Sequence, residues 1–112
     1  MRNKPVASKP LSEPVLLILL SLAEKPRHGY GLMKDIETLS SGRVRLSTGT
    51  LYGALRRLLQ DLWIEGFEQD DTSREKQAYK LTSEGRKRLH AELERMKQLT
   101  RAATARMRTR EA

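Results

Sequence analysis

The segment from Leu46 to Leu58, LSTGTLYGALRRL, constrains the fold of this chain more than any other stretch. Ser47 can accept a hydrogen bond from a free amide in the first turn of a helix, and a helix places the leucines that follow on one face. Those leucines are Leu51, Leu55, Leu58 and Leu62. The pattern predicts a capped amphipathic helix over Thr48–Leu62 that buries its leucines and leaves its two arginines off that face.

Similar signals predict the elements on either side of this helix. Ser12 is suited to cap a helix that runs to about Ala23, and Gly42 is suited to end a second helix that starts near Gly29. The other expected elements are a brief extended stretch at Val44–Leu46, strands at Trp63–Glu68 and Gln77–Thr82, and a helix from Ser83 to near the end. The predicted fold class is mostly α with a small β-hairpin, within one small domain.

The charge of the chain points to a polyanionic partner. It has 22 Lys and Arg against 14 Asp and Glu, a formal net charge of +8 over 112 residues. Nucleic acid is the first candidate, although small proteins are also often basic for solubility. The apolar run Val15–Leu20 is far below the roughly 18 residues that span a bilayer, so we expect a buried helix and no membrane partner. Cysteine is absent, and the cytoplasm is the expected compartment.

Residues that could carry catalysis or hold a metal are scarce. The two histidines, His28 and His90, lie far apart in the chain, and no Gly-rich phosphate loop, nucleophile elbow or HExxH pair is present. We expect each histidine to be a surface or helix-end residue rather than a ligand or a base. The sequence therefore predicts a protein that is not an enzyme and that has no cofactor or metal.

The helix at Thr48–Leu62 and the helix before it have the features of a helix-turn-helix. Small residues at its leading end let a helix enter a major groove about 12 Å wide and approach the base edges, while the tyrosine and arginines behind them can donate to phosphates. The predicted DNA-contacting residues are Ser47, Thr48, Thr50, Tyr52, Gly53, Arg56 and Arg57. A capped amphipathic helix with a solvated basic face explains this segment alone equally well.

The strand pair that follows favours the DNA-binding interpretation. A hairpin directly after the third helix is typical of the wing of a winged helix, whose tip lies near the minor groove or the backbone. Arg74, Lys76 and Lys80 are placed to make such contacts. The acidic residues of the tip, QDDTSREK, support an alternative in which a winged-helix module binds an acidic protein partner with little DNA specificity.

The predicted last helix is too long to bury its apolar stripe within so small a fold. The stripe has a spacing near the 3.5-residue period of a coiled coil, so we expect a second copy of the chain to cover it. Its members are Leu89, Leu93, Met96, Ala103 and Met107. The predicted organisation is a flexible basic tail at 1–11, a winged-helix DNA-binding domain at 12–82, and a C-terminal dimerisation helix at 83–112 with a basic end that frays after Thr100.

Four motifs together resemble the PadR-like transcriptional regulators, especially the short members of that family. They are HGY at 28–30, LSTGTLYGALRRL at 46–58, WIE at 63–65 and YKLTSEGRKRL at 79–89, in the order and spacing of the family. The similarity covers about residues 14–100. It implies a winged-helix domain that binds double-stranded DNA, a homodimer, and repression from an inverted-repeat operator.

The resemblance also implies roles for residues outside the third helix. It places Tyr30 near the surface that contacts the DNA backbone, and Lys34 follows one turn later. It implies that the last helix packs against the N-terminal and C-terminal helices of a partner copy. The resulting interface comprises Leu16, Leu20, Leu89, Leu93, Met96 and Ala103.

The chain departs from the family pattern at three places. Proline is usual where Thr48 and Gly53 stand, and the wing commonly has a glycine-rich basic tip and a Tyr-Tyr pair. Some short members bind flat compounds at the dimer interface through an aromatic of the last helix, where this chain has Met96 nearby and no aromatic in that helix. A small-molecule effector of unknown identity therefore stays an open expectation.

Overall fold

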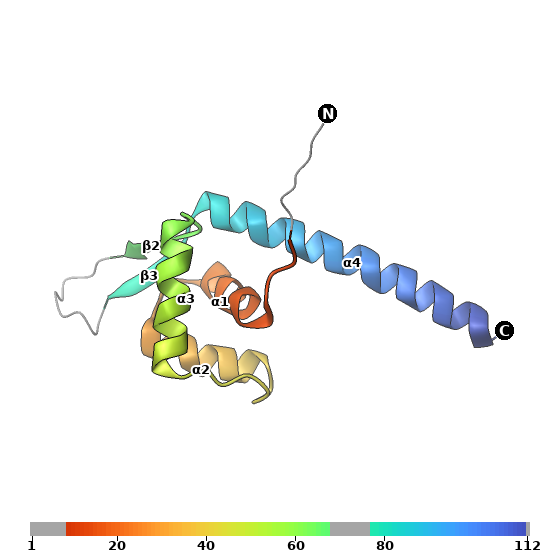
Figure 1. Cartoon of the computed structure of the whole chain (residues 1–112), viewed down its shortest axis with the longest axis horizontal. Helices are drawn as coiled ribbons and strands as arrows, with labels where there is room; N and C mark the ends of the chain where they lie inside the picture. Colours follow the sequence, from red (N-terminus) through yellow and green to blue (C-terminus); the bar gives the residue numbers. More distant parts are fainter. Residues whose placement is uncertain (1–8, 68–76, 112) are drawn as a thin grey trace.

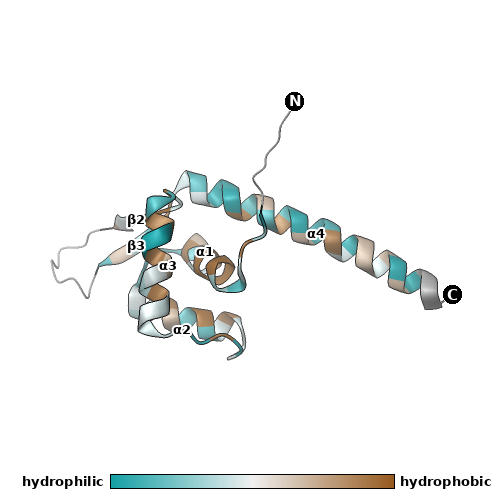
Figure 2. Cartoon of the chain, in the orientation of Figure 1, coloured by the Kyte–Doolittle hydropathy of each residue, from teal (hydrophilic) through white to brown (hydrophobic). Residues whose placement is uncertain are grey.

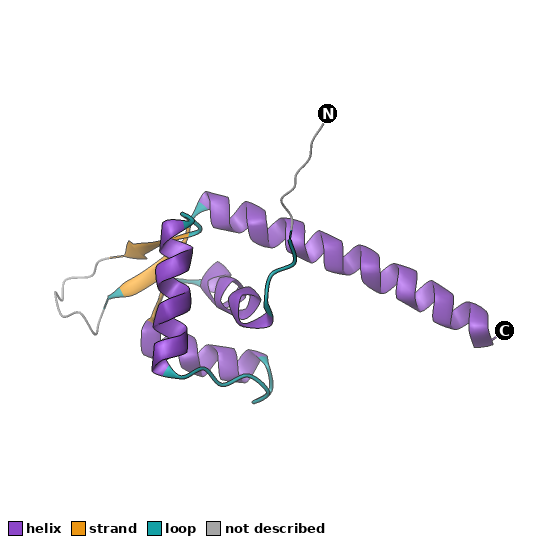
Figure 3. Cartoon of the chain, in the orientation of Figure 1, coloured by secondary structure: helices purple, strands orange, loops and turns teal. Residues whose placement is uncertain are grey.

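The computed structural model describes residues 9–67 and 77–111 and is mostly helical, with one small sheet (Figure 1, Figure 3). In chain order the elements are α1 (Glu13–Glu24), β1 (Arg27–His28), α2 (Gly29–Leu39), α3 (Thr48–Gln60), β2 (Ile64–Phe67), β3 (Ala78–Leu81) and α4 (Ser83–Glu111). Three helices and the sheet form a compact unit, and α4 extends away from it. The predicted fold class is confirmed.

The sheet has three antiparallel strands in the order β1-β3-β2, so β3 is its centre. Gly66 of β2 and Arg27 of β1 both stand opposite Tyr79 of β3. The sequence analysis missed β1, because two residues are too few to show an alternating pattern. The extended stretch expected at Val44–Leu46 forms no strand and is part of the loop before α3.

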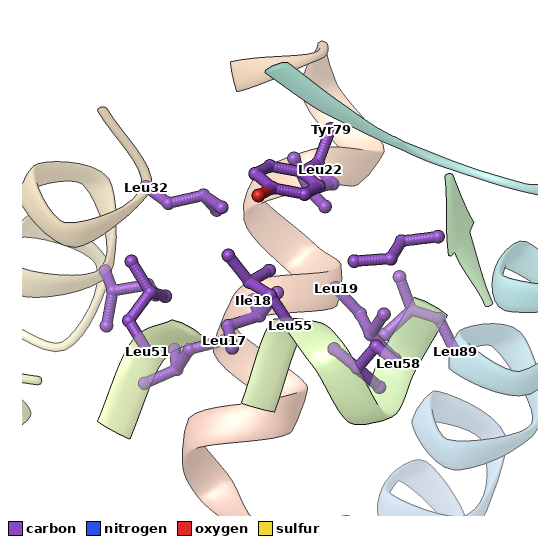
Figure 4. Close-up of a cluster of buried hydrophobic side chains, with 12 residues drawn as sticks. Leu17, Ile18, Leu19, Leu22, Leu32, Leu51, Leu55, Leu58, Tyr79 and Leu89 are labelled. Atoms are coloured by element: carbon purple, nitrogen blue, oxygen red, sulfur yellow. The ribbon is translucent and has the colours of Figure 1, made fainter. Parts of the chain in front are cut away.

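The core is built around α1, and the leucine face predicted for α3 is part of it. Leu51, Leu55 and Leu58 are buried against α1, and Leu58 lies near Leu19 and Leu89 in Figure 4. The buried cluster is Leu17, Ile18, Leu19, Leu22, Leu32, Ile36, Leu51, Leu55, Leu58, Ile64, Tyr79 and Leu89. Burying these side chains supplies the main stabilisation of so small a unit, at about 25 cal/mol per Å² of apolar surface.

Two tight turns follow the ends of α2 and α3. Between α2 and α3, Ser41 and Gly42 have φ of 54° and 80°, and the Gly42 amide donates to the Glu37 carbonyl at 2.8 Å. At the other end Leu62, which the sequence analysis placed inside the helix, has φ 64° and is 68% exposed. The expected helix boundary is wrong by two residues, because the left-handed conformation at Leu62 turns the chain into β2.

The start of α4 is joined to the chain that leaves α3. The Thr82 hydroxyl donates to the Leu62 carbonyl at 2.6 Å and accepts from the Gly85 amide at 3.0 Å, which caps α4. A Cβ on Gly85 would overlap the Trp63 carbonyl oxygen, so only glycine lets α4 approach this closely. The TSEG sequence therefore fixes the first turn of α4 against Leu62 and Trp63.

Beyond this junction α4 leaves the compact unit. The helix is continuous to Glu111, past Thr100, where fraying was expected. Figure 2 shows apolar positions recurring among polar ones along this extension. The large apolar side chains of α4 that are exposed are Leu93, Met96, Leu99 and Met107.

The segment before α1 is ordered where a flexible tail was expected. Leu11 packs against the core, and its amide donates to the Glu92 carboxylate at 3.1 Å. The backbone at Lys9 and Leu11 is therefore held by α4, where Glu92 accepts from the Leu11 amide and Arg88 donates to the Lys9 carbonyl. Residues 1–8 lie outside the described part of the chain.

Candidate nucleic-acid interface

The leading end of α3 is exposed and capped by Ser47. The Ser47 Oγ accepts a hydrogen bond from the Thr50 amide at 3.1 Å and donates one to the Thr50 Oγ1 at 3.0 Å. The Leu51 amide bonds to the Ser47 carbonyl at 2.9 Å, which leaves the amides of Thr48 and Gly49 without acceptors in the helix. These amides and the two threonine hydroxyls form a tip that can donate to a phosphate or a base edge.

One face of α3, opposite the buried leucines, is largely exposed among the described residues. By helical periodicity this face comprises Gly49, Gly53, Arg56, Arg57 and Gln60. Both arginines are exposed, and neither has an ion pair or side-chain hydrogen bond within residues 9–67 and 77–111. We call these five residues, with the tip Ser47–Thr50, the α3 face.

The two glycines of the α3 face have no role that the described structure explains. A Cβ added at Gly49 or at Gly53 would meet nothing within 4 Å beyond its own turn among the described residues. Glycine inside a helix costs about 0.5–1 kcal/mol relative to alanine. The described part of the fold therefore gives no packing reason for a glycine at position 53.

Tyr52 lies on the flank of α3 and has a packing role that the sequence analysis missed. It is half-buried against the core, and a Cβ on Gly29 would overlap its hydroxyl. Burial first, and the neighbouring Tyr52 phenol second, raise the pKa of Tyr79 on β3. Gly29 of the HGY motif is therefore a glycine because Tyr52 leaves no room for a side chain at that position. Contact between Tyr52 and DNA stays a prediction.

Two other predicted residues are placed on the surface of α2. Tyr30 is 69% exposed, and the Lys34 ammonium lies over its ring, 5.7 Å from the centroid. This pair presents a flat ring and a cation beside the start of α2, the helix end against which Tyr52 packs. Both remain available to an external phosphate.

The wing is described only at its base. Lys80 of β3 lies 3.6 Å from the Glu65 carboxylate and over the Phe67 ring, 5.4 Å from the centroid, so its charge is partly engaged within the hairpin. Arg74 and Lys76, the predicted contacts at the tip, lie outside the described residues.

The predicted subunit-interface residues divide into two groups. Leu89 is 5% exposed and packs in the core of its own chain, so its assignment to the subunit interface is wrong. The apolar stripe of α4 that includes Leu89 leaves the intrachain core within two turns and continues along the exposed part of the helix. Leu93 and Met96 are exposed there, and Leu16 and Leu20 are half-buried on α1.

Catalytic and metal-binding groups do not gather anywhere in the described residues. No cluster of three His, Asp or Glu side chains with metal-binding geometry occurs among them, and none of the described helices could cross a membrane. His28 stands at the N-cap of α2 and His90 is exposed on α4, as expected for helix-end and surface residues.

Gly49 and Gln60 belong to the α3 face but were not predicted as site residues. The signal was available, because Gly49 lies one turn before Gly53 and Gln60 lies one turn after Arg56. Neither residue was predicted, because neither carries the hydroxyl group or positive charge that marked most of the predicted DNA-contacting residues.

Comparison with known proteins assigns this chain to a protein family. The model of the transcriptional regulator PadR-like family matches residues 18–91, which includes α2, α3 and the hairpin. The chain belongs to the PadR-like family. It is therefore a transcriptional regulator with a winged-helix fold rather than an enzyme, which confirms that prediction.

Individual relatives of this PadR-like chain share its fold at low identity. A PadR family transcription regulator of Clostridium difficile R20291 is 22% identical, with 86% of this chain and 99% of that chain covered and a TM-score of 0.71. A PadR-like transcription factor of Bacteroides fragilis is 25% identical, with 81% and 86% covered and a TM-score of 0.68.

A curated relative is considerably longer than this chain. An uncharacterized 37.1 kDa protein in a transposon of Streptomyces fradiae is 36% identical over 85 residues, or 76% of this chain. The chain spans only 23% of the length of that protein.

Proposed function

We propose that this PadR-like regulator is a sequence-specific repressor that binds double-stranded DNA through the α3 face. The observation that carries the proposal is the surface at Gly49 and Gly53 without side chains, which lies between an exposed hydroxyl tip and two arginines that have no ion pair among the described residues. A helix backbone uncovered in this way can approach base edges closely, while the arginines reach phosphates or a guanine. Binding to chromosomal DNA would place the protein in the cytoplasm.

We further propose that the protein acts as a homodimer on an inverted repeat. The second half of α4 carries large apolar side chains that are exposed in the single chain, and a second copy of the chain could bury them. Two copies related by a two-fold axis present two α3 helices to successive major grooves. The half-site centres are then about 10 bp apart, or one helical turn.

A small-molecule effector is the last element of the proposal. The α4 helix contains no Phe, Tyr or Trp on which a flat compound could stack at the subunit interface, and the imidazole of His90 is its one aromatic ring. An effector would therefore be held mainly by aliphatic and charged groups of α4. A thermal-shift screen in the presence of operator tests for one.

Selection of bound sequences from random duplex DNA tests the main proposal. The expected product is an enriched inverted repeat, and log affinity for it should fall steeply with log salt. Absence of any enriched motif, together with stable capture of an acidic protein, would instead favour the winged-helix interaction module.

Variants of the α3 face locate the contact. Arg56→Ala should weaken operator binding by about tenfold or more at fixed salt, the scale of one lost base or phosphate contact. Tyr52→Phe tests whether the hydroxyl contributes beyond its packing. Lys97→Ala, which removes one cation from α4, is the matched control and should change affinity little. Unchanged affinity in both α3 variants would show that another surface binds DNA.

A further inference from the structure

Glu92 is a buried carboxylate in a helix whose surface is mostly exposed. Only 2% of its surface is accessible, although it lies on α4 between the exposed residues Ala91 and Leu93. Its Oε2 accepts from Arg95 Nη2 at 2.7 Å and from the Leu11 amide at 3.1 Å, and Oε1 accepts from Arg95 Nε at 3.2 Å. A buried carboxylate is tolerated only where such donors satisfy it.

Arg88 extends this arrangement to two further segments. Its Nη1 lies 3.7 Å from Glu92 Oε1, and its Nη2 donates to the Lys9 carbonyl. Its guanidinium lies over the Trp63 ring, 5.5 Å from the centroid. We call Glu92, Arg88 and Arg95, with the backbone of Lys9 and Leu11, the Glu92 cluster. It joins α4 to the segment before α1 and to the chain that leaves α3.

The Glu92 cluster is the second of two polar attachments of α4. The first is the junction of Thr82 and Gly85 with Leu62 and Trp63. Glu92 lies nine residues after Ser83, or about 14 Å along the helix axis at 1.5 Å per residue. Between them Leu89 makes an apolar contact, which is not directional. A helix that is attached at one point can rotate about that point, whereas a helix that is attached at two points has a fixed direction.

We propose that Glu92 is a positioning residue that sets the angle of α4 against the winged-helix unit and so the separation of the two α3 helices in the dimer. The inference rests on the proposed function, because it requires α4 to pair with a second copy. The free part of α4 amplifies any error at the cluster. The helix extends about 42 Å from its start, so a displacement of 1 Å at Glu92 becomes about 3 Å at the end.

The first experiment measures the angle without DNA. Since the chain has no cysteine, Thr38→Cys on α2 and Thr104→Cys on α4, both at exposed positions, provide a pair of spin labels. Pulsed electron resonance on labelled chain diluted with unlabelled chain gives the intrachain distance distribution. We expect one narrow distribution for the parent and a broader or shifted one for Glu92→Gln. Glu94→Gln, the same charge change at an exposed position two residues later, should leave it unchanged.

The second experiment measures the effect on DNA. Affinities are compared on a series of inverted repeats whose half-site spacing varies in steps of one base pair. The parent should prefer its best spacing by about tenfold or more, comparable with the penalty of one mismatched base pair. Glu92→Gln should reduce this preference to about threefold or less, while sedimentation still shows a dimer.

A matched pair of variants at Leu11 covers the case in which Glu92→Gln does not fold. Leu11→Pro removes the amide donor to Glu92, whereas Leu11→Ala keeps it and loses only the side chain. The proline variant alone should broaden the label distance and relax the spacing preference.

The outcomes separate the two proposals. A parent that selects no DNA site overturns the proposed function, and the label distances then still decide whether Glu92 sets the angle. A parent that selects an inverted repeat, with folded Glu92→Gln that keeps the same distance distribution and spacing preference, overturns the role of Glu92.

Discussion

Gly53 lowers the stability of the helix that contains it, and no described neighbour needs a glycine there. Glycine within a helix leaves more backbone freedom to the unfolded chain than any other residue, and here no neighbour requires its lack of a side chain. Burial of the Glu92 carboxylate is also costly to the fold, but this cost is offset within the fold by its hydrogen bonds to Arg95 and to the Leu11 amide. The hydrogen bond from Arg95, above all, lowers the pKa of Glu92, while burial opposes this shift.

Gly53→Ala should therefore raise stability and weaken DNA binding in the same molecule. We expect the free energy of unfolding to increase by about 0.5–1 kcal/mol, measured by urea denaturation, since the alanine methyl meets no described atom. Operator affinity should fall by about tenfold, because the methyl holds the helix off the bases. Gly42→Ala is the contrasting control, since φ of 80° there makes alanine destabilising. A variant that binds operator as well as the parent would remove the close-approach argument.

The pH dependence of stability should reveal the Glu92 cluster. Because the folded-state pKa of Glu92 is lower than its ordinary value of 4.5, its charged form stabilises the fold above that pH, and the contribution is lost as the pH falls through the folded pKa. The difference in unfolding free energy between the parent and Glu92→Gln should thus be largest near pH 6 and shrink below pH 4.5. A difference that did not vary between pH 6 and pH 3 would contradict the pairing.

Among the elements, α3 has one face that packs in the core and another, exposed face that we propose binds DNA. Its leucine face packs on α1, and its leading turn is stabilised by Ser47, whose hydroxyl also holds the Thr50 side chain. The α1 helix has an equivalent cap at Ser12, with a longer bond of 3.4 Å to the Val15 amide. The two caps have similar local chemistry, but only the first belongs to the α3 face.

Removing each cap separates these roles. Ser47→Ala and Ser12→Ala should each lower the free energy of unfolding by about 0.5–2 kcal/mol, measured by thermal or urea denaturation. Only Ser47→Ala should also weaken operator binding, because it frees the Thr50 side chain and alters the tip. Equal effects of both variants on DNA affinity would indicate that the loss reflects stability alone.

For the whole molecule, the decisive feature is that α4 is longer than the unit that supports it. Its first turns pack on α1, with Leu89 in the core and Glu92 bound to the segment before α1, and its later turns expose large apolar side chains. A helix whose apolar stripe does not pack against other elements is only marginally stable in water. We therefore expect the stability of the later turns of α4 to depend on a partner. Folding and assembly of this protein are then expected to be linked.

Leu93→Arg should convert the dimer into a monomer. The substitution places a charge in the proposed subunit interface, where it has no partner, and sedimentation equilibrium measures the result. Gln98→Arg adds the same charge to an exposed position on another face of α4 and should leave the dimer intact. A dimer that persisted in Leu93→Arg would place the interface elsewhere on the molecule.

Periodic features were predictable from the sequence because they repeat at the spacing of a single element. The leucine face of α3, its Ser47 cap, the position of the hairpin and the length of α4 all follow from local patterns in the chain. The exposed α3 face was predictable in part, since hydroxyls and arginines are visible as residue types. Gly49 was not predicted, although it lies one turn before Gly53, because it has neither a hydroxyl nor a charge.

The sequence by itself therefore determined the order of the four helices and the hairpin, the buried leucine face of α3 and the presence of an apolar stripe on α4, but not the short strand β1. Only the tertiary structure decided that Leu89 is intrachain core, that Tyr52 packs on Gly29, and that Glu92 and Arg88 hold the backbone of Leu11 and Lys9. The contacts of Tyr52, Arg88 and Glu92 join residues 23 to 81 positions apart, and no local periodicity encodes which distant partner a side chain meets. That choice depends on how the helices pack together, which is a property of the whole fold.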